Sequence, residues 1–327
     1  MPVRVIEGVV QHYAWGDREF IPKLLGVAGR GEPWAELWLG THPNGPATLD
    51  DGSPLSELTG ELGYLLKVLA AGEPLSLQTH PDGAQARAGF EHGVFGDPHP
   101  KPELLVALTE FEALCGVRPS DASERLLRRL GAGEVASVVA TDGPGVAMHA
   151  LYRRELDAAP VIAACRSAAG ESVDGPEAAW VRALDDRYPG EASVAVALLL
   201  NHVVLQPGEA IHLTAGNLHA YLRGAGIELM KASDNVVRGG LTVKEVDINL
   251  LLDTVDPTPL ADPVMQVQEG RYPLPEADVV LERLDPGDSH RSTGHELAVS
   301  LDGTTLYLSP GTQVYADSTT FVVTSNT

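Results

Sequence analysis

The sequence predicts a mainly β protein, with two jelly-roll units and a helical insert. Glycine (34) and proline (24) are frequent among the 327 residues, which favours many turns. Most of the chain consists of short extended runs between those turns, and only residues 120–192 have a helical pattern. A chain of this length can form two or three domains, each with a sizeable core.

The first β unit is expected to combine residues 1–119 with residues 193–255. Apolar runs such as Leu65–Leu69, Leu75–His80 and Leu104–Leu108 are separated by gaps that contain proline or glycine. Runs of this length bounded by turn residues are typical of strands.

The helical insert is expected at residues 120–192. Leucines recur at helical spacing after Ser120, and Asp121 with Glu124 can form a capping pair at the start of the first helix. The segment 188–190, Tyr-Pro-Gly, should end the last helix because proline cannot continue the hydrogen-bond ladder.

Extended sequence returns after the insert. Residues Leu198–Leu205, Ala210–Leu213 and Leu218–Leu222 are predicted to be strands. Residues 256–327 form a further β region, in which two Pro-Gly turns resemble the one at Pro207. This weak internal similarity suggests a second, related jelly-roll unit at residues 256–327.

Charge and composition limit the possible partners. The chain has 23 basic and 45 acidic residues and a net charge of −22, so we expect no nucleic acid or membrane partner, although a local cationic pocket can still bind a small anion. No apolar run is long enough to span a bilayer, and the opening residues have no targeting pattern. We therefore expect a cytoplasmic monomer, in which Cys115 and Cys165 are buried, reduced thiols.

Strand alternation identifies candidate metal ligands. Side chains two positions apart on a strand share a face, and on three predicted strands the shared face is polar. These side chains are Ser76, Gln78 and His80 on the first strand, Lys101 and Glu103 on the second, and His219 and Tyr221 on the third.

Two histidines and one glutamate from separate strands match the three-ligand pattern of catalytic zinc. His80, His219 and Glu103 fit this pattern, and the carbonyl oxygen of Gln78 can add a fourth bond. On spacing alone, a solvent-exposed sheet face is the more common explanation of such residues. The spacing therefore leaves both interpretations open.

A polar loop with glycines follows, at residues 232–244. Its cations are Arg238 and Lys244, and its glycines let the backbone approach a ligand closely. A guanidinium suits a phosphate or a developing enediolate. The alternative is a surface ion pair between Arg238 and Asp234.

Tryptophans form a third feature. Trp15 or Glu36 can contact a sugar, because aromatic faces and carboxylates bind hydroxylated rings, whereas Trp34 and Trp38 are expected to pack in the core.

Together these segments resemble type I mannose-6-phosphate isomerases, also called phosphomannose isomerases. Six segments match in family order and cover roughly half of the chain. They are QHYAWGD at 11–17, PWAELWLGTHP at 33–43, LLKVLAAGEPLSLQTHPD at 65–82, KPELLVALTEFEALCGVRP at 101–119, YPGEASVAVALLLNHVVLQPGEAIHLTAGNLHAYLRG at 188–224 and IELMKASDNVVRGGLTVKEVDINLLLD at 227–253.

The resemblance implies a zinc enzyme on a cupin-type jelly-roll scaffold that interconverts mannose 6-phosphate and fructose 6-phosphate. It implies one Zn²⁺ per chain, an active-site arginine at Arg238, and a catalytic domain made of residues 1–119 and 193–255. The implied metal ligands are Gln78, His80, Glu103 and His219. Contacts to the sugar phosphate are expected from Trp15, Ser76, Lys101, Tyr221, Asp234 and Lys244.

The resemblance is weaker in parts of the chain. The stretch between His80 and Glu103 and the helical insert are shorter than in larger family members, and the last 70 residues match weakly. Isomerisation through a cis-enediol requires a base. The sequence leaves Asp234, Glu228, Lys101 and a metal-bound water as alternatives.

Two other functions compete with the isomerase. A non-catalytic, zinc-containing sugar-binding cupin has no need of a cationic pocket beside the metal, so Arg238 and Lys101 argue against it. A cupin oxygenase that holds iron normally has more histidine ligands than a set containing Gln78 and Glu103.

Overall fold

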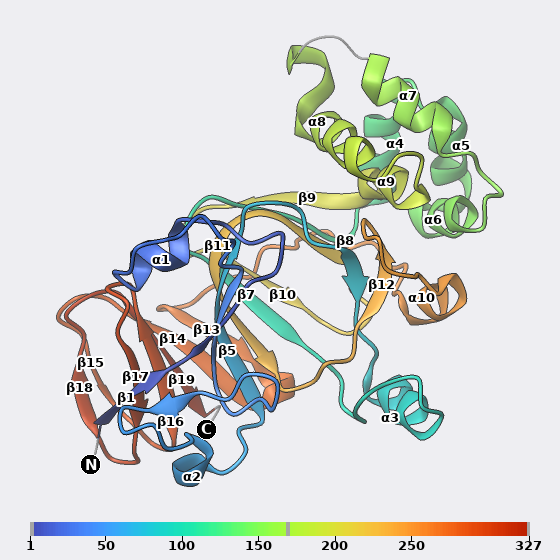
Figure 1. The fold of residues 1–327 in the computed structure, drawn as a ribbon. Coiled ribbons are helices and arrows are strands. Elements are labelled where there is room, and N and C mark those ends of the chain that lie inside the picture. Colours follow the sequence, from blue (N-terminus) through green and yellow to red (C-terminus); the bar gives the residue numbers. More distant parts are fainter. Residues whose placement is uncertain (1–2, 168–170, 326–327) are drawn as a thin grey trace.

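The computed structural model describes residues 3–167 and 171–325 and confirms the prediction of a mainly β protein. Two large antiparallel sheets form the body, and a cluster of helices stands at one end of it (Figure 1). No helix in the described ranges is long and apolar enough to cross a membrane. Cys115 and Cys165 are buried thiols, as predicted.

The larger sheet carries most of the residues singled out from the sequence. Its ten strands are β2 (Val9–Gln11), β3 (Glu36–Leu39), β5 (Tyr64–Ala71), β6 (Leu77–Thr79), β7 (Glu103–Ala107), β8 (Phe111–Val117), β9 (Leu200–Leu205), β10 (Ala210–Leu213), β11 (His219–Lys231) and β12 (Val237–Gly240).

Strand β11 joins the two layers of this sheet. Its first part pairs with β6 and β8, and its second part, from Gly224, pairs with β5 and β7. The strand changes register between Tyr221 and Arg223, and Gly224 has a φ of 115°. Such a φ favours glycine, and a Cβ at this position would meet the backbone of Glu110 and Phe111. The bend therefore turns one long strand into part of both walls of a cavity.

The second sheet contains seven strands and draws on both ends of the chain. In spatial order they are β13 (Arg271–Leu274), β14 (Val279–Leu284), β19 (Thr320–Ser325), β16 (Glu296–Ser300), β17 (Thr305–Leu308), β1 (Val3–Glu7) and β4 (Thr48–Leu49). A separate pair consists of β15 (Ser289–Arg291) and β18 (Gln313–Tyr315). One apolar cluster includes Val68 and Ile227 of the larger sheet and Leu281 and Phe321 of the second sheet. The two sheets therefore share a core.

The helical insert consists of α4 to α9 and a short 3₁₀ helix. Their bounds are α4 (Ser120–Arg129), α5 (Gly133–Asp142), α6 (Pro144–Tyr152), α7 (Ala159–Ser167), α8 (Glu171–Arg187), α9 (Ala192–Val196) and η1 (Ala197–Leu199).

Helix α8 ends at Arg187, directly before the predicted stop at Pro189. The predicted capping pair at the start of α4 is wrong. The helix begins after Pro119, and Asp121 and Glu124 instead pair with arginines one turn later. The strand predicted from Leu198 also begins two residues later, because Leu198 and Leu199 belong to the 3₁₀ helix.

Five short helices connect the strands outside the insert. They are α1 (Phe20–Leu24), α2 (Ser56–Thr59), α3 (Gly83–Glu91), α10 (Ile248–Thr254) and η2 (Pro275–Ala277). Helix α3 begins with a capping box. The carboxylate of Asp82 accepts a hydrogen bond from the backbone N–H of Gln85, and Oε1 of Gln85 accepts one from the backbone N–H of Asp82. This helix and the loop after it lie between the strands that carry His80 and Glu103.

Candidate active site

His80, Glu103 and His219 come together where three strands meet. His80 follows β6, while Glu103 and His219 are the first residues of β7 and β11. Oε2 of Glu103 lies 3.3 Å from Nε2 of His80 and 3.5 Å from Nε2 of His219. All three side chains are buried, and their ligand atoms lie within 4.8 Å of one another.

Gln78 adjoins this triad from the neighbouring strand. It pairs in register with His219, and its Nε2 lies 3.4 Å from Nε2 of His219. Rotation of the amide by about 180° presents the carbonyl oxygen of Gln78 to the same point. The structure thus brings together the four residues that were expected to bind metal.

Backbone carbonyls orient both imidazole rings. Nδ1 of His80 lies 2.8 Å from the carbonyl oxygen of Asn235, and Nδ1 of His219 lies 2.9 Å from that of Asn217. A carbonyl can only accept, so each Nδ1 carries a proton, and in a neutral ring the Nε2 that faces Glu103 is then an acceptor. Metal-binding histidines are held in this tautomer in the same way.

Asp97 holds the segment that orients His80. Its carboxylate accepts from Oγ of Ser233 at 3.0 Å, from the backbone N–H of Asp234 at 3.1 Å and from Nδ2 of Asn235 at 3.2 Å. Nδ2 of Asn235 also donates to the backbone oxygen of Asp97 at 2.8 Å. The loop after α3 therefore holds the carbonyl group of Asn235 in place, and this carbonyl orients the ring of His80.

The electrostatics of the triad suit a divalent cation. Burial opposes ionisation of Glu103, but the charge of Lys101 holds the pKa of Glu103 well below its ordinary value. Burial lowers the pKa of His80, which keeps this ring neutral and able to bind metal. Nε2 of His80 and Oε2 of Glu103 are buried and have no hydrogen-bond partner within residues 3–167 and 171–325.

Zinc fits this arrangement of donors. Zinc–ligand bonds of about 2.0–2.2 Å at tetrahedral angles separate the donor atoms by roughly 3.3–3.6 Å. The separations of Oε2 of Glu103 from the two histidine nitrogens, 3.3 and 3.5 Å, lie within that interval.

A pocket of about 600 Å³ opens beside the triad, between the two walls of the larger sheet. All the residues predicted to contact substrate line this pocket, and so do Gln78, Glu103 and Arg238. The predicted contacts are Trp15, Ser76, Lys101, Tyr221, Asp234 and Lys244.

The cations of the pocket have different surroundings. Lys101 is buried, and its Nζ lies 2.8 Å from Oε1 of Glu103. Arg238 is half-buried on β12, opposite Gln78, and Lys244 is exposed in the loop that follows. The expected alternative pairing of Arg238 with Asp234 is not among the ion pairs of the described residues. The carboxylate of Asp234 instead lies 3.4 Å from Nε2 of His42.

The tryptophans divide between pocket and core. Trp15 is half-buried and lines the pocket. Trp38 is buried as predicted, but it also lines the pocket, and its Nε1 donates to Oε2 of Glu36 at 2.6 Å. Trp34 packs, partly buried, against the core shared by the two sheets.

A buried lysine in the pocket, Lys67, was not predicted from the sequence. Nζ of Lys67 lies 2.9 Å from Oε2 of Glu228 and 3.5 Å from Oε1 of Glu36. Burial opposes its charge, but Glu228 and Glu36 hold the pKa of Lys67 above its ordinary value. The available signal was a single lysine within the apolar run Leu65–Leu69.

The bend in β11 brings Tyr221 and Glu228 together. Seven residues of straight strand span roughly 23 Å and leave the two ends on opposite faces. Here the hydroxyl of Tyr221 donates to Oε1 of Glu228 at 3.0 Å, because the strand changes register and bends between them. Burial raises the pKa of Glu228 in spite of Lys67. A carboxylate with a raised pKa in a pocket is suited to proton transfer.

Several known proteins are similar to this chain in sequence and in fold. A model of the type I phosphomannose isomerase catalytic domain matches residues 53–120. The mannose-6-phosphate isomerase of Salmonella typhimurium is 32% identical to the chain, over 89% of the chain and 86% of that protein. The crystal structure of its apo form superposes with a TM-score of 0.85 at 28% identity and covers 100% of both chains. The crystal structure bound to substrate and zinc gives 0.82 at 28% identity, covering 99% of this chain and 97% of the other.

Proposed function

The chain belongs to the type I phosphomannose isomerases, and we therefore propose that it interconverts mannose 6-phosphate and fructose 6-phosphate with the help of one zinc ion. The observation that carries the proposal is the convergence of His80, Glu103 and His219 on one point at the wall of a cation-lined pocket. The solved relative that holds both substrate and zinc supports the choice of the metal and of the sugar phosphate.

Gln78, His80, Glu103 and His219 would hold the metal. Zinc supplies Lewis-acid polarisation of substrate oxygens when it is bound. The protein's contribution is to orient the two histidines, to keep His80 neutral and to keep Glu103 ionised. Lys101, 2.8 Å from Oε1 of Glu103, leaves Oε2 of that carboxylate for the metal.

Aldose–ketose isomerisation moves a proton from C2 to C1 through a cis-enediol. In the forward direction Glu228 takes the proton from C2 as the C2–H bond breaks, and it then gives that proton to C1 and returns to its ionised state. The hydroxyl proton on O2 passes to O1, so that the atoms balance. Glu228 is favoured over Asp234 because it is buried, it lies on the pocket wall and its pKa is raised, whereas Asp234 is exposed.

Cations in the pocket would compensate the charge of the substrate and of the enediolate. The net charge of −22 repels a sugar phosphate at long range, so binding requires local positive charge. Arg238 is assigned to the enediolate because it lies opposite Gln78 on the neighbouring strand. Lys244, exposed at the pocket rim, is assigned to the phosphate.

A monomer in the cytoplasm is part of the same proposal. Every residue in the proposed mechanism comes from one chain, so the reaction needs no second subunit. The two buried thiols are consistent with a reducing compartment.

A coupled assay tests the proposed function. Purified protein should convert mannose 6-phosphate to fructose 6-phosphate, lose this activity on dialysis against a chelator, and regain it when zinc is added back. Protein that binds one zinc and fructose 6-phosphate but shows no turnover would instead be the non-catalytic sugar-binding cupin. Retention of full activity without metal would contradict the role of zinc.

A further inference from the structure

The helical insert contacts the strand that carries Arg238. The hydroxyl of Tyr152, at the end of α6, donates to the backbone oxygen of Gly239 at 2.6 Å. Tyr152 is itself buried in the apolar cluster of the insert. The contact thus ties the residue next to Arg238 to the rigid interior of the insert.

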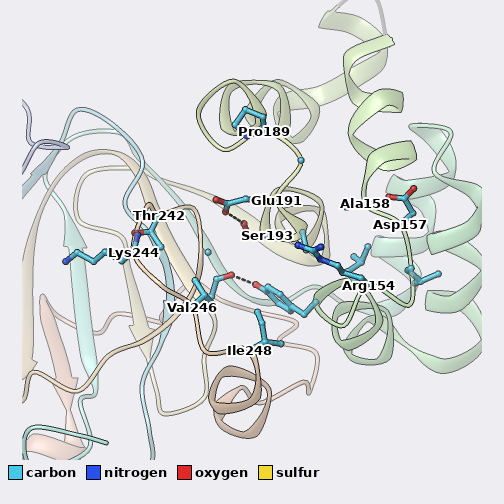
Figure 2. Close-up of a pocket in the computed structure, with 17 residues that line it drawn as sticks. Arg154, Asp157, Ala158, Pro189, Glu191, Ser193, Thr242, Lys244, Val246 and Ile248 are labelled. Carbon is cyan, nitrogen blue, oxygen red and sulfur yellow. Dashed lines mark hydrogen bonds between the residues drawn. The ribbon is translucent and has the colours of Figure 1, made fainter.

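A second contact holds the next part of the same segment. The backbone N–H of Leu241 lies 3.2 Å from Oε2 of Glu191 and 3.3 Å from Oγ of Ser193, and Ser193 donates to Glu191 at 2.9 Å. Glu191 and Ser193 lie at the beginning of α9. Figure 2 shows both residues on the wall of a cavity of about 630 Å³ between the insert and the segment that carries Thr242 and Lys244.

Strand pairing supports this segment on one side. Strand β12 pairs with β6 alone among the described strands, so it is an edge strand. Its register with β6 shifts between Arg238 and Gly240. Helix α9 of the insert and helix α10 pack against β12.

Small residues make this close approach possible. A Cβ at Gly240 would overlap the side chain of Ser193, and a Cβ at Gly239 would lie 3.2 Å from the hydroxyl of Tyr152. Leu241 follows with a φ of 52°, unusual for a residue with a side chain, and is buried in the cluster of the insert. The insert thus determines the backbone path immediately after Arg238.

We propose that the helical insert is a positioning element for Arg238, acting through the hydrogen bonds from Tyr152 to Gly239 and from Leu241 to Glu191 and Ser193. The inference rests on the proposed function, in which Arg238 acts in the substrate pocket. Tyr152, Glu191 and Ser193 are positioning residues, because the pocket beside the triad does not include them among its lining residues.

The test is a double-mutant cycle in the full-length, zinc-loaded protein. Tyr152→Phe removes one oxygen and should lower kcat about 10- to 100-fold, the range expected when a catalytic group is displaced by about 1 Å. In an Arg238→Ala background the same substitution should change kcat less than about 2-fold, because non-additivity is expected when one residue acts through another. Ser193→Ala is the second variant and should behave in the same way.

The chain offers a matched control. The hydroxyl of Tyr272, in the second sheet, donates to the backbone oxygen of Gly208 at 2.9 Å. Tyr272→Phe removes the same kind of hydrogen bond, from tyrosine to a glycine carbonyl, and should leave kcat unchanged. Hydrogen exchange of a peptide covering 236–244 should rise in Tyr152→Phe and stay unchanged in Tyr272→Phe.

The outcomes separate this inference from the proposed function. The positioning role would be overturned if Tyr152→Phe lowered kcat equally in the presence and absence of Arg238. It would also be overturned if Tyr152→Phe and Tyr272→Phe lowered kcat equally. Neither result would contradict the proposed isomerase activity. An unmutated, zinc-loaded protein without isomerase activity would overturn the proposed function, and the positioning role with it. A loss that disappears in the Arg238→Ala background, with faster exchange at residues 236–244, supports the inference.

Discussion

Nδ1 of His80 donates to the backbone oxygen of Asn235 at 2.8 Å, although the two residues are 155 positions apart in the chain. The contact sets both the tautomer and the direction of the ring. Asn235 is in turn held by Asp97, so the orientation of His80 depends on a residue that is not itself a proposed ligand.

Asp97→Ala should weaken zinc binding. Loss of the carboxylate releases Ser233 and Asn235, and loss of a group that supports a ligand typically costs about 10- to 100-fold in metal affinity. Competition with a chromogenic chelator measures this affinity. Asp302→Ala is the control, because Asp302 accepts from the backbone N–H of Thr304 in a turn of the second sheet. Equal zinc affinities in the two variants would show that the Asp97 loop does not support the triad.

Glu103→Gln should abolish zinc retention. The unmutated protein is expected to contain about one zinc per chain, as follows from a single set of ligands. The variant loses the ligand charge and should contain almost none after dialysis, as measured by elemental analysis. Glu296→Gln is the control, because Glu296 is as buried as Glu103 but lies in the second sheet. A Glu103→Gln protein that keeps its full zinc content would exclude this carboxylate as a ligand.

Arg238→Ala should reduce turnover far more than stability. The side chain is half-buried and contributes little to a core, whereas loss of charge stabilisation in a transition state costs about 10²- to 10³-fold in kcat. The melting temperature and kcat of the variant should be compared with those of Arg271→Ala, which removes a strand arginine paired with Glu282. A variant that melts much earlier yet turns over normally when folded would assign Arg238 to stability alone.

Glu228 should set the acidic limb of the pH–rate profile. A base must be deprotonated, so activity falls as the pH drops through its pKa. Because burial raises the pKa of Glu228, this fall should occur above the ordinary glutamate value of about 4.3. Glu228→Gln should lose about 10²- to 10⁴-fold in kcat and should no longer show this limb. An unchanged limb in the variant would transfer the role of base to another group.

Lys244→Ala should affect the phosphorylated substrate selectively. Loss of one charge-assisted contact costs about 1.5–3 kcal/mol, or roughly 10- to 150-fold in affinity. The KM for mannose 6-phosphate should rise accordingly, and inorganic phosphate should inhibit the variant less. Binding of free mannose should not change. Lys23→Ala, which removes an exposed lysine on α1, is the control and should alter neither the KM for mannose 6-phosphate nor inhibition by phosphate. Equal losses for both sugars would assign Lys244 a role other than phosphate binding.

Strand alternation was informative for the metal site because each candidate ligand lies in or directly beside a strand. Gln78 and His80 share a face two positions apart, and the structure sets them beside His219 and Glu103. Alternation defines a face but not which strands meet, so the convergence of the four residues had to come from the family resemblance. Their roles as ligands remain predictions.

Lys67 and the second sheet show what local patterns miss. The glutamates that stabilise Lys67 lie 31 and 161 positions away, so no spacing in the sequence relates them. Likewise, β1 pairs with β17 on one side and with β4 on the other. Residues that were expected in the first β unit therefore lie in the same sheet as the strands near the end of the chain. Pairing between distant segments depends on the tertiary structure and leaves no local signal.

The pairing of β1 with β17 also has a consequence for biosynthesis. The hydroxyl of Thr305 donates to the backbone oxygen of Ile6 across 299 positions, so β1 leaves the ribosome long before β17 and must wait for it. At about 5–20 residues per second, that wait is roughly 15–60 s. During this time the edge that β1 will cover does not yet exist, and β1, which pairs with β4 only at Ile6 and Glu7, keeps an open edge able to pair with other chains. The risk of aggregation is therefore greatest in the nascent chain, and chaperones that bind extended segments near the N-terminus should raise the yield of folded protein.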